Sequence, residues 1–188
     1  MTAVLIVAFD GLQPSQIDPH SMPVLSKFAD SGVRFSHNHS VFPSVTRTNA
    51  ATIVTGVGPG KHGLTANKSM FPEYSSTQVV DALHPTLSEI NQHTKGKLLF
   101  VPTIGEIIRN HNLQWVSVVG GTSGNAYIQH PKAAENGHVV IHPEFTDPTI
   151  HSDKIKSQYG DWPSKKAPAA DLIRRTADVA IGYALTEL

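Results

Sequence analysis

The chain has 188 residues, 39% of them hydrophobic, and a formal net charge of zero. This length and composition suit one sizeable globular domain with its own core. The balanced charge gives no indication of nucleic acid or an anionic membrane as a partner. Cysteine is absent, which excludes a disulfide framework, thiolate zinc sites and thiol catalysis.

The first strong pattern is the apolar stretch AVLIVAF at residues 3–9. It is too short to span a bilayer, and it has no basic segment before it and no cleavage site after it. We therefore expect no signal peptide, no membrane association and a cytoplasmic location. A continuous β-branched run closed by Asp10 and Gly11 predicts a fully buried strand.

The next segments predict two short helices with a strand between them. Residues 22–32 have apolar side chains at helical spacing and end at a glycine, which commonly terminates helices. Residues 33–35 predict a second short strand. Residues 46–55 are small, have helical spacing and are stopped by Gly56.

Two further helices are expected in the middle of the chain. The pattern over residues 69–96 is mixed and indicates mostly loop, with a helix near 87–93. Residues 103–112 predict a helix in which Thr103 is the N-cap and Glu106, three residues later, completes a capping box.

The remaining segments complete an α/β pattern. Residues 113–119 and 137–143 predict buried strands, and the polar residues 146–168 predict a loop excursion. Residues 169–188 predict a long amphipathic helix, with these apolar side chains on or near one face: Leu172, Ala177, Ala180, Ile181 and Leu185. Strands that alternate with helices indicate an α/β fold with a mainly parallel sheet flanked by helices. We expect residues 1–188 to belong to one domain.

Asp10 is the first candidate functional residue, because ligands of such sheets sit at the carboxyl ends of strands. Asp-Gly is also a common turn after a strand. A carboxylate that ends a buried apolar strand is costly unless it is paired or bound to a cation. The residues alone leave both interpretations open.

Thr46 and Arg47 are the next candidates. If Thr46 opens a helix, its hydroxyl lies where backbone N–H groups and the helix dipole favour an anion. It can then be an ordinary N-cap, or a nucleophile that still needs a base or a metal. Arg47 can hold a phosphate with two hydrogen bonds, or be a solvated arginine at a helix start.

Two glycine-rich stretches do not match phosphate-binding motifs. GVGPGK at residues 56–61 differs from a Walker A loop in its glycine spacing, and it follows a helix rather than a strand. GGTSGN at residues 120–125 lacks dinucleotide-loop spacing, and we interpret it as a permissive loop near the site. We expect His37 and His39 to lie at the surface rather than in a metal site. We expect His62 to make a structural contact in a turn.

Taken together, VAFDGL, MPVLSKFADSGVRF and SVFPSVTRTNAATIVTGVGPGKHGLTAN resemble the alkaline phosphatase superfamily. They are most similar to its type I phosphodiesterase/nucleotide pyrophosphatase branch. The matching positions are these: Asp10, Thr46, Thr55, Gly56, Pro59, His62, Gly63 and Asn67. Several spaced positions agree at once, so the resemblance is specific, and it covers nearly the whole chain.

The resemblance implies an alkaline-phosphatase-like fold and a hydrolase of phosphodiester or nucleotide pyrophosphate bonds. It implies two divalent metal ions, usually zinc, with Asp10 and Thr46 as metal ligands. Thr46 would be the nucleophile and form a phosphothreonine intermediate. Asn67 would donate to a phosphoryl oxygen, helped by the backbone N–H of Arg47, and Asn49 is a nearby polar residue that could bind substrate. The expected partner is a small phosphoester or nucleotide.

The family's second Asp, its Asp-His pair and its further histidines have no counterpart here, since no D-x-x-x-H pattern lies at a strand end. The chain therefore resembles the N-terminal part of the fold and looks truncated, and we expect the 188 residues alone to be inactive or nearly so. One alternative is a non-catalytic, truncated or degenerate member that associates with itself through an uncovered sheet edge. Another is a phosphomonoesterase or phosphonate hydrolase of the same superfamily.

Overall fold

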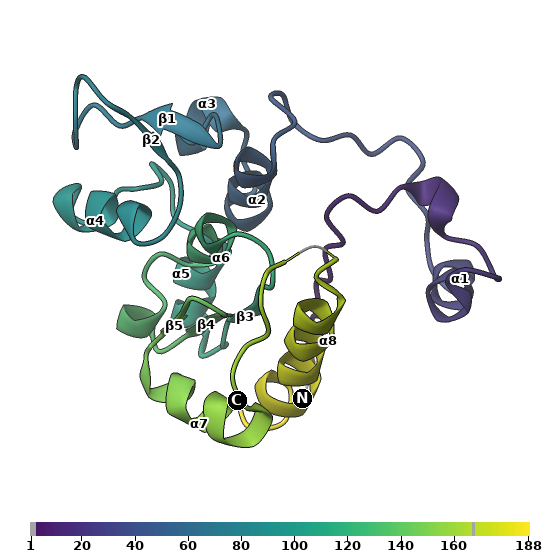
Figure 1. Ribbon diagram of the computed structural model, residues 1–188. Helices are drawn as coiled ribbons and strands as arrows, with labels where there is room; N and C mark the ends of the chain where they lie inside the picture. The colour runs from purple at the N-terminus through teal and green to yellow at the C-terminus, as the bar shows by residue number, and fades with distance from the viewer. Residues whose placement is uncertain (1–2, 167) are drawn as a thin grey trace. The chain divides into compact units, whose positions relative to one another are not determined.

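The computed structural model describes residues 3–166 and 168–188, and Figure 1 traces the chain. Two compact units are distinguished, Met1–Ser40 and Val41–Leu188. Each is described by itself below, and the expected single domain over residues 1–188 stays a prediction. No helix in the described ranges is long and apolar enough to cross a membrane.

In residues 3–40, the described part of the first unit, the regular elements are a 3-10 helix at Pro14–Gln16 and α1 at Pro23–Asp30. The helix expected over residues 22–32 is thereby confirmed. The strands expected over 3–9 and 33–35 are wrong, because neither segment forms a strand. Val4 and Phe9 are 87% and 57% exposed. A strand needs a hydrogen-bonded neighbour, and no other strand is described in this unit to provide one.

The second unit contains all the described strands and the other helices. Its α-helices and strands, in chain order, are α2 (Thr46–Thr55), α3 (Pro59–His62), β1 (Lys68–Met70), β2 (Val79–Asp81), α4 (Thr86–His93), α5 (Ile104–Ile108), β3 (Val116–Val118), α6 (Ser123–Gln129), β4 (Val139–His142), β5 (Phe145–Asp147), α7 (Ile150–Tyr159) and α8 (Ala170–Val179). Short 3-10 helices follow α5 at Arg109–His111 and precede β4 at Ala134–Asn136, and a π-helical turn at Ala180–Ala184 follows α8.

The helices expected from the sequence around α2, α4 and α5 are confirmed. Gly56 ends α2 with a φ of +68°, a backbone conformation that glycine adopts without strain. Thr103 caps α5, and both hydrogen bonds of its capping box with Glu106 are present. Local signals are sufficient here, because caps and terminators act within a few residues.

The sheet is small and mixed, so the expected mainly parallel sheet is not supported. β3 and β4 pair in parallel with Val116 opposite Val139, whereas β4 and β5 pair antiparallel. β1 and β2 form a separate antiparallel hairpin that the sequence pattern did not predict. Because strand side chains alternate between faces, Val140 packs beside α6, and Ile141 packs with residues of α7 and α8.

The C-terminal third departs from the sequence prediction in two respects. Residues 146–168 include the end of β5 and all of α7, although a loop was expected. Only Ile155 of α7 is buried, so the helix has little apolar pattern to reveal it. The amphipathic helix expected over residues 169–188 is present as α8 and the π-helical turn after it. Its buried apolar side chains are Leu172, Val179 and Tyr183, whereas Ile181 and Leu185 of the predicted face are 64% and 62% exposed.

The main core of the second unit lies among α2, α4, α6 and the hairpin. It contains these buried side chains: Ala50, Ala51, Val54, Leu64, Ala82, Leu87, Ile90, Leu98, Leu99, Tyr127 and Ile128. In Figure 1, α2 lies beside α6, and the two helices are in contact. This packing holds the first turn of α2, where the candidate nucleophile lies, against a rigid support.

Candidate active site

Thr46 is the first residue of α2. Val45 before it is the N-cap residue and is extended, with φ −96° and ψ 150°, and its own side chain makes no capping hydrogen bond. The Thr46 side chain is half-buried, at the position where first-turn N–H groups lack partners within a helix. Thr46 therefore follows the cap position rather than occupying it, which removes the ordinary N-cap interpretation.

Asn67 lies against this first turn. The backbone N–H of Arg47 donates to Asn67 Oδ1 at 3.2 Å, and Arg47 Nη1 donates to the Asn67 carbonyl oxygen at 2.5 Å. Both acceptor atoms of Asn67 are thus held by one residue. In the described part of the chain, Asn67 Nδ2 has no hydrogen-bond acceptor, so the amide is oriented with its donor atoms unused.

The Arg47 side chain is buried, with only 7% of the residue exposed. Its Nη1 lies 3.9 Å from Asp81 Oδ1, and Asp81 also pairs with Lys68 at 3.3 Å. Burial lowers the pKa of the Arg47 guanidinium, and the Asp81 carboxylate opposes this shift. The alternative of a solvated arginine is therefore excluded. Its Nε is buried without a partner among the described residues.

Gly124 of α6 makes room for this arginine. A Cβ atom there would lie 1.8 Å from the Ala82 carbonyl oxygen and 3.1 Å from Arg47 Nε. Only glycine allows α6 to approach Ala82, the residue after β2, and Arg47 so closely. The interpretation of GGTSGN as a loop is correct only up to Thr122, because α6 begins at Ser123. Sequence reasoning gave Gly124 no role, since its neighbours lie far along the chain.

Asn49 is engaged with the backbone on both sides of its amide. Its Nδ2 donates to the Val45 carbonyl oxygen at 3.0 Å, and its Oδ1 accepts from the Val41 N–H at 3.1 Å. These bonds fix the segment that leads into α2. A role of Asn49 in substrate binding stays a prediction, and its described contacts are with the chain itself.

His62 makes the structural contact that its turn position predicted. Its side chain is fully buried, its Nδ1 accepts from the Leu64 N–H at 3.1 Å, and its Nε2 lies 3.1 Å from Thr52 Oγ1. This pair ties α3 to α2. His37 and His39 are exposed.

Asp10 lies in the first unit, in a turn where Gly11 has a φ of +81°. It is exposed and does not end a strand, contrary to expectation. Among the described residues, no group of three or more His, Asp or Glu side chains is placed to hold a metal ion. A zinc site needs at least three protein ligands, so these residues alone do not fit one. Zinc binding through Asp10 and Thr46 stays a prediction.

Comparison with known proteins gives the family. Residues 4–179 match the sequence profile of the type I phosphodiesterase/nucleotide pyrophosphatase family, and the chain belongs to that family. The resemblance seen in the sequence motifs is therefore confirmed. The small mixed sheets with flanking helices are consistent with an alkaline-phosphatase-like α/β fold.

Individual relatives match over shorter regions. A bis(5'-adenosyl)-triphosphatase of Homo sapiens is 33% identical over 42% of this chain and 17% of its own length. An ectonucleotide pyrophosphatase/phosphodiesterase of Caenorhabditis elegans is 33% identical over 38% of this chain and 9% of its own length. The matched regions thus span less than a quarter of these relatives. No solved structure matches the chain significantly.

Proposed function

We propose that this protein is a hydrolase of phosphodiester or nucleotide pyrophosphate bonds in which Thr46 is the nucleophile. The observation that carries the proposal is the first turn of α2, where Thr46 is followed by the Arg47 N–H bound to Asn67 Oδ1. Membership of the phosphodiesterase family and the names of the relatives support the same reaction class.

The proposed reaction has two displacement steps at phosphorus. Thr46 Oγ attacks the phosphorus, the bond to the leaving oxygen breaks, and the hydroxyl proton is released. The phosphoryl group is then held as an ester of threonine until water attacks and restores the hydroxyl. The Asn67 Nδ2 donor, oriented by Arg47, is suited to bind a phosphoryl oxygen as negative charge grows on it.

Backbone groups at the helix start add to this effect. A phosphate at the N-terminus of a helix is favoured by the helix dipole, whereas the Arg47 N–H of this first turn is already bound to Asn67 Oδ1. The Arg47 N–H and guanidinium hold Asn67, which supports an indirect role for Arg47 in orienting the proposed phosphoryl-oxygen donor. Direct bidentate binding of phosphate by its side chain stays a prediction.

Two divalent metal ions, usually zinc, are proposed from the family resemblance. When bound, such ions neutralise phosphate charge and lower the pKa of a hydroxyl nucleophile. The described residues contain no three-donor group for them. We therefore assign no step to a metal and expect low turnover from the 188 residues alone.

Hydrolysis of bis(p-nitrophenyl) phosphate with added Zn²⁺ tests the proposal. We expect slow release of nitrophenol that is lost in Thr46→Ala and partly kept in Thr46→Ser. Thr55→Ala, at the far end of the same helix, serves as the control. Hydrolysis that persists in Thr46→Ala would overturn the proposal, whereas none by the unaltered chain would agree with the expected inactivity of these 188 residues and favour the non-catalytic alternative. Two tightly held zinc ions per chain would overturn the expectation of low turnover.

A second candidate function is a non-catalytic phosphate-binding or interaction domain. The absence of a three-donor metal group among the described residues is the observation that favours it. It differs from the first proposal in predicting phosphate binding at α2 without any Thr46-dependent hydrolysis. A phosphomonoesterase or phosphonate hydrolase would instead show turnover of nitrophenyl phosphate or of a phosphonate in the same assay.

A further inference from the structure

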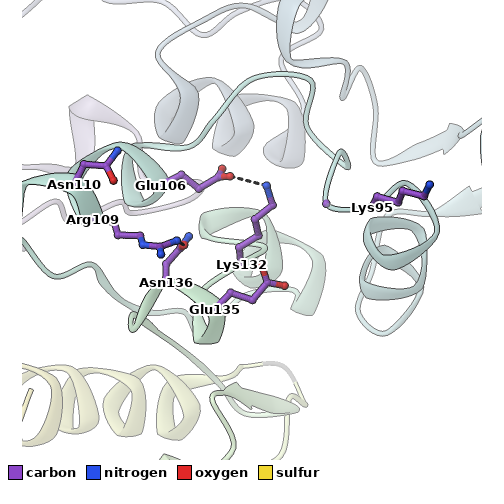
Figure 2. Close-up of a pocket in the computed structure, with 8 residues that line it drawn as sticks. Lys95, Glu106, Arg109, Asn110, Lys132, Glu135 and Asn136 are labelled. Carbon is purple, nitrogen blue, oxygen red and sulfur yellow. Dashed lines mark hydrogen bonds and ion pairs between the residues drawn. The ribbon is translucent and has the colours of Figure 1, made fainter.

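A polar pocket of about 460 Å³ lies in the second unit, at the end of α5 (Figure 2). Its size is within the range of small-molecule sites. It is lined by charged and amide side chains from three separate segments, among them Glu106, Arg109, Lys132 and Asn136. None of these residues takes part in the proposed hydrolysis.

Arg109 supplies one cation of the pocket. Its Nη1 donates to Asn136 Oδ1 at 2.6 Å, which fixes the guanidinium beside the Asn136 amide (Figure 2). The other N–H groups of Arg109 have no hydrogen-bond partner among the described residues. An arginine presents its donors in a planar fork that matches an oxyanion, so one edge of this fork is held and the rest can bind.

Lys132 supplies a second cation whose position is also fixed. Its Nζ lies 2.7 Å from Glu106 Oε1, and the two side chains are 28% and 21% exposed. Its stem passes over Gly96, where an added Cβ would lie 2.7 Å from Lys132 Cε. In Figure 2, Lys132 points toward Glu106, whereas the Lys95 side chain points away from this pair.

Glu106 is already committed to structural contacts. Its Oε2 accepts from the Thr103 N–H at 2.8 Å as part of the capping box. Burial acts to raise the pKa of Glu106, but the hydrogen bonds from Lys132 and Thr103 outweigh it, and the pKa is lowered. The Glu106 carboxylate therefore stays ionised and pairs with Lys132. It makes no ion pair with Arg109.

Beneath the pocket, a buried polar network holds Asn136 and Glu106 in place. Asn136 Nδ2 lies 3.3 Å from His130 Nε2, and His130 Nδ1 lies 3.2 Å from Thr103 Oγ1. His130 is 1% exposed and is also 3.0 Å from His138 Nδ1. Polar groups fixed in this way lose little conformational entropy when a ligand binds.

We propose that this pocket binds a small oxyanion, a phosphate or carboxylate group, between Arg109 and Lys132. With Lys95 pointing away, the charges of Arg109 and Lys132 are balanced by Glu106 and Glu135. Recognition therefore comes from the fork of Arg109, which matches the geometry of two oxyanion oxygens. The site is separate from the first turn of α2, and its occupancy does not depend on the proposed hydrolysis.

Titration of the ¹⁵N-labelled chain with inorganic phosphate, and separately with acetate, tests this proposal. We expect saturable shifts of the amide signals of Arg109, Lys132 and Asn136 with at least one of the two anions. Arg109→Ala should weaken that binding by about tenfold or more, because a charge-assisted pair of hydrogen bonds is lost. Comparison of the two anions identifies which oxyanion source the site prefers.

Two controls separate this site from other effects. Lys61→Ala removes an exposed cation elsewhere, and Thr46→Ala alters the proposed nucleophile; both should leave the pocket shifts unchanged. Because Arg109 is exposed, Arg109→Ala is expected to remain folded, and its unperturbed signals will verify this. The proposal would be overturned if neither anion shifted the amide signals of the pocket residues. It would also be overturned if Lys61→Ala weakened anion binding as much as Arg109→Ala does.

Discussion

Arg47 holds Asn67 by two different groups, its backbone N–H on the side-chain oxygen and its guanidinium on the carbonyl oxygen. The two residues belong to α2 and to the segment just before β1, so the pair links the candidate nucleophile's helix to the hairpin. Asp81 on β2 lies near the same guanidinium. This clamp is the structural feature on which the proposed site depends.

Removal of the Arg47 side chain should therefore destabilise the protein. Arg47→Ala deletes the donor to the Asn67 carbonyl and leaves a cavity at a buried position. We expect the free energy of unfolding to fall by about 1–3 kcal/mol, measured by urea denaturation. Arg174→Ala removes an exposed arginine paired with Asp171 at 3.4 Å and should change stability by less than about 0.5 kcal/mol. If the two variants lowered the free energy of unfolding equally, the stabilising role of the Arg47–Asn67 contact would be contradicted.

Gly124 offers a second test of the same packing. Gly124→Ala places a Cβ against the Ala82 carbonyl, and a backbone atom cannot move aside as a side chain can. We expect a loss of about 3 kcal/mol or more in the free energy of unfolding, or a failure to fold. Gly121→Ala is the matched control, since an added Cβ there meets nothing within 4 Å. A Gly124→Ala variant as stable as the control would show that α6 packs differently.

Stability should also fall in mild acid because of buried histidines. Burial lowers the pKa of His130 from 6.5 to about 4, with a further contribution from His138. The folded state keeps this ring neutral while the unfolded chain takes up a proton. The stabilising contribution is thus complete above about pH 6.5 and is lost as the pH falls toward 4, by about 3 kcal/mol.

Urea unfolding at several pH values between 7 and 4.5 measures this effect. Burial lowers the pKa of His62, His84, His138, His142 and His151 as well, so the total slope should exceed that of His130 alone. His130→Gln should flatten the profile. A profile insensitive to His130→Gln would contradict the assignment.

Self-association of the chain stays a prediction that a size measurement can test. Val4, Leu5, Ile6 and Val7 are each more than half exposed, and contiguous exposed apolar residues favour association. We expect sedimentation to show an apparent mass that rises with concentration. Leu5→Lys with Val7→Lys should reduce the effect, and a monomer at all concentrations would contradict it.

Local signals predicted several helices well. The capping box of Thr103 and Glu106 and the terminator Gly56 act within a few residues, so the sequence alone reveals them. α8 shows the limit of periodicity, since a helix with two apolar stripes leaves the choice between them to tertiary packing. Leu172 of α8 is buried, whereas Ile173 of α8 and Ile181 of the π-helical turn after it are exposed.

Long-range contacts account for what the sequence did not show. The stretch at residues 3–9 has the composition of a buried strand, but composition cannot supply a pairing neighbour. The contact between Gly124 and Ala82 joins segments more than 40 residues apart, and no local pattern marks it. The resemblance to the family singled out Asn67 beside Arg47, whereas the burial of the Arg47 guanidinium appeared only in the structure.

Mass spectrometry of a quenched reaction tests the central claim most directly. The chain is incubated with bis(p-nitrophenyl) phosphate and Zn²⁺, quenched in acid and digested. The account predicts a nitrophenyl-phosphoryl group on the peptide that contains Thr46, assigned to Thr46 by fragmentation and absent from Thr46→Ala. A modification at another residue such as Thr48, or hydrolysis with no covalent species in any quenched sample, would contradict Thr46 as the nucleophile.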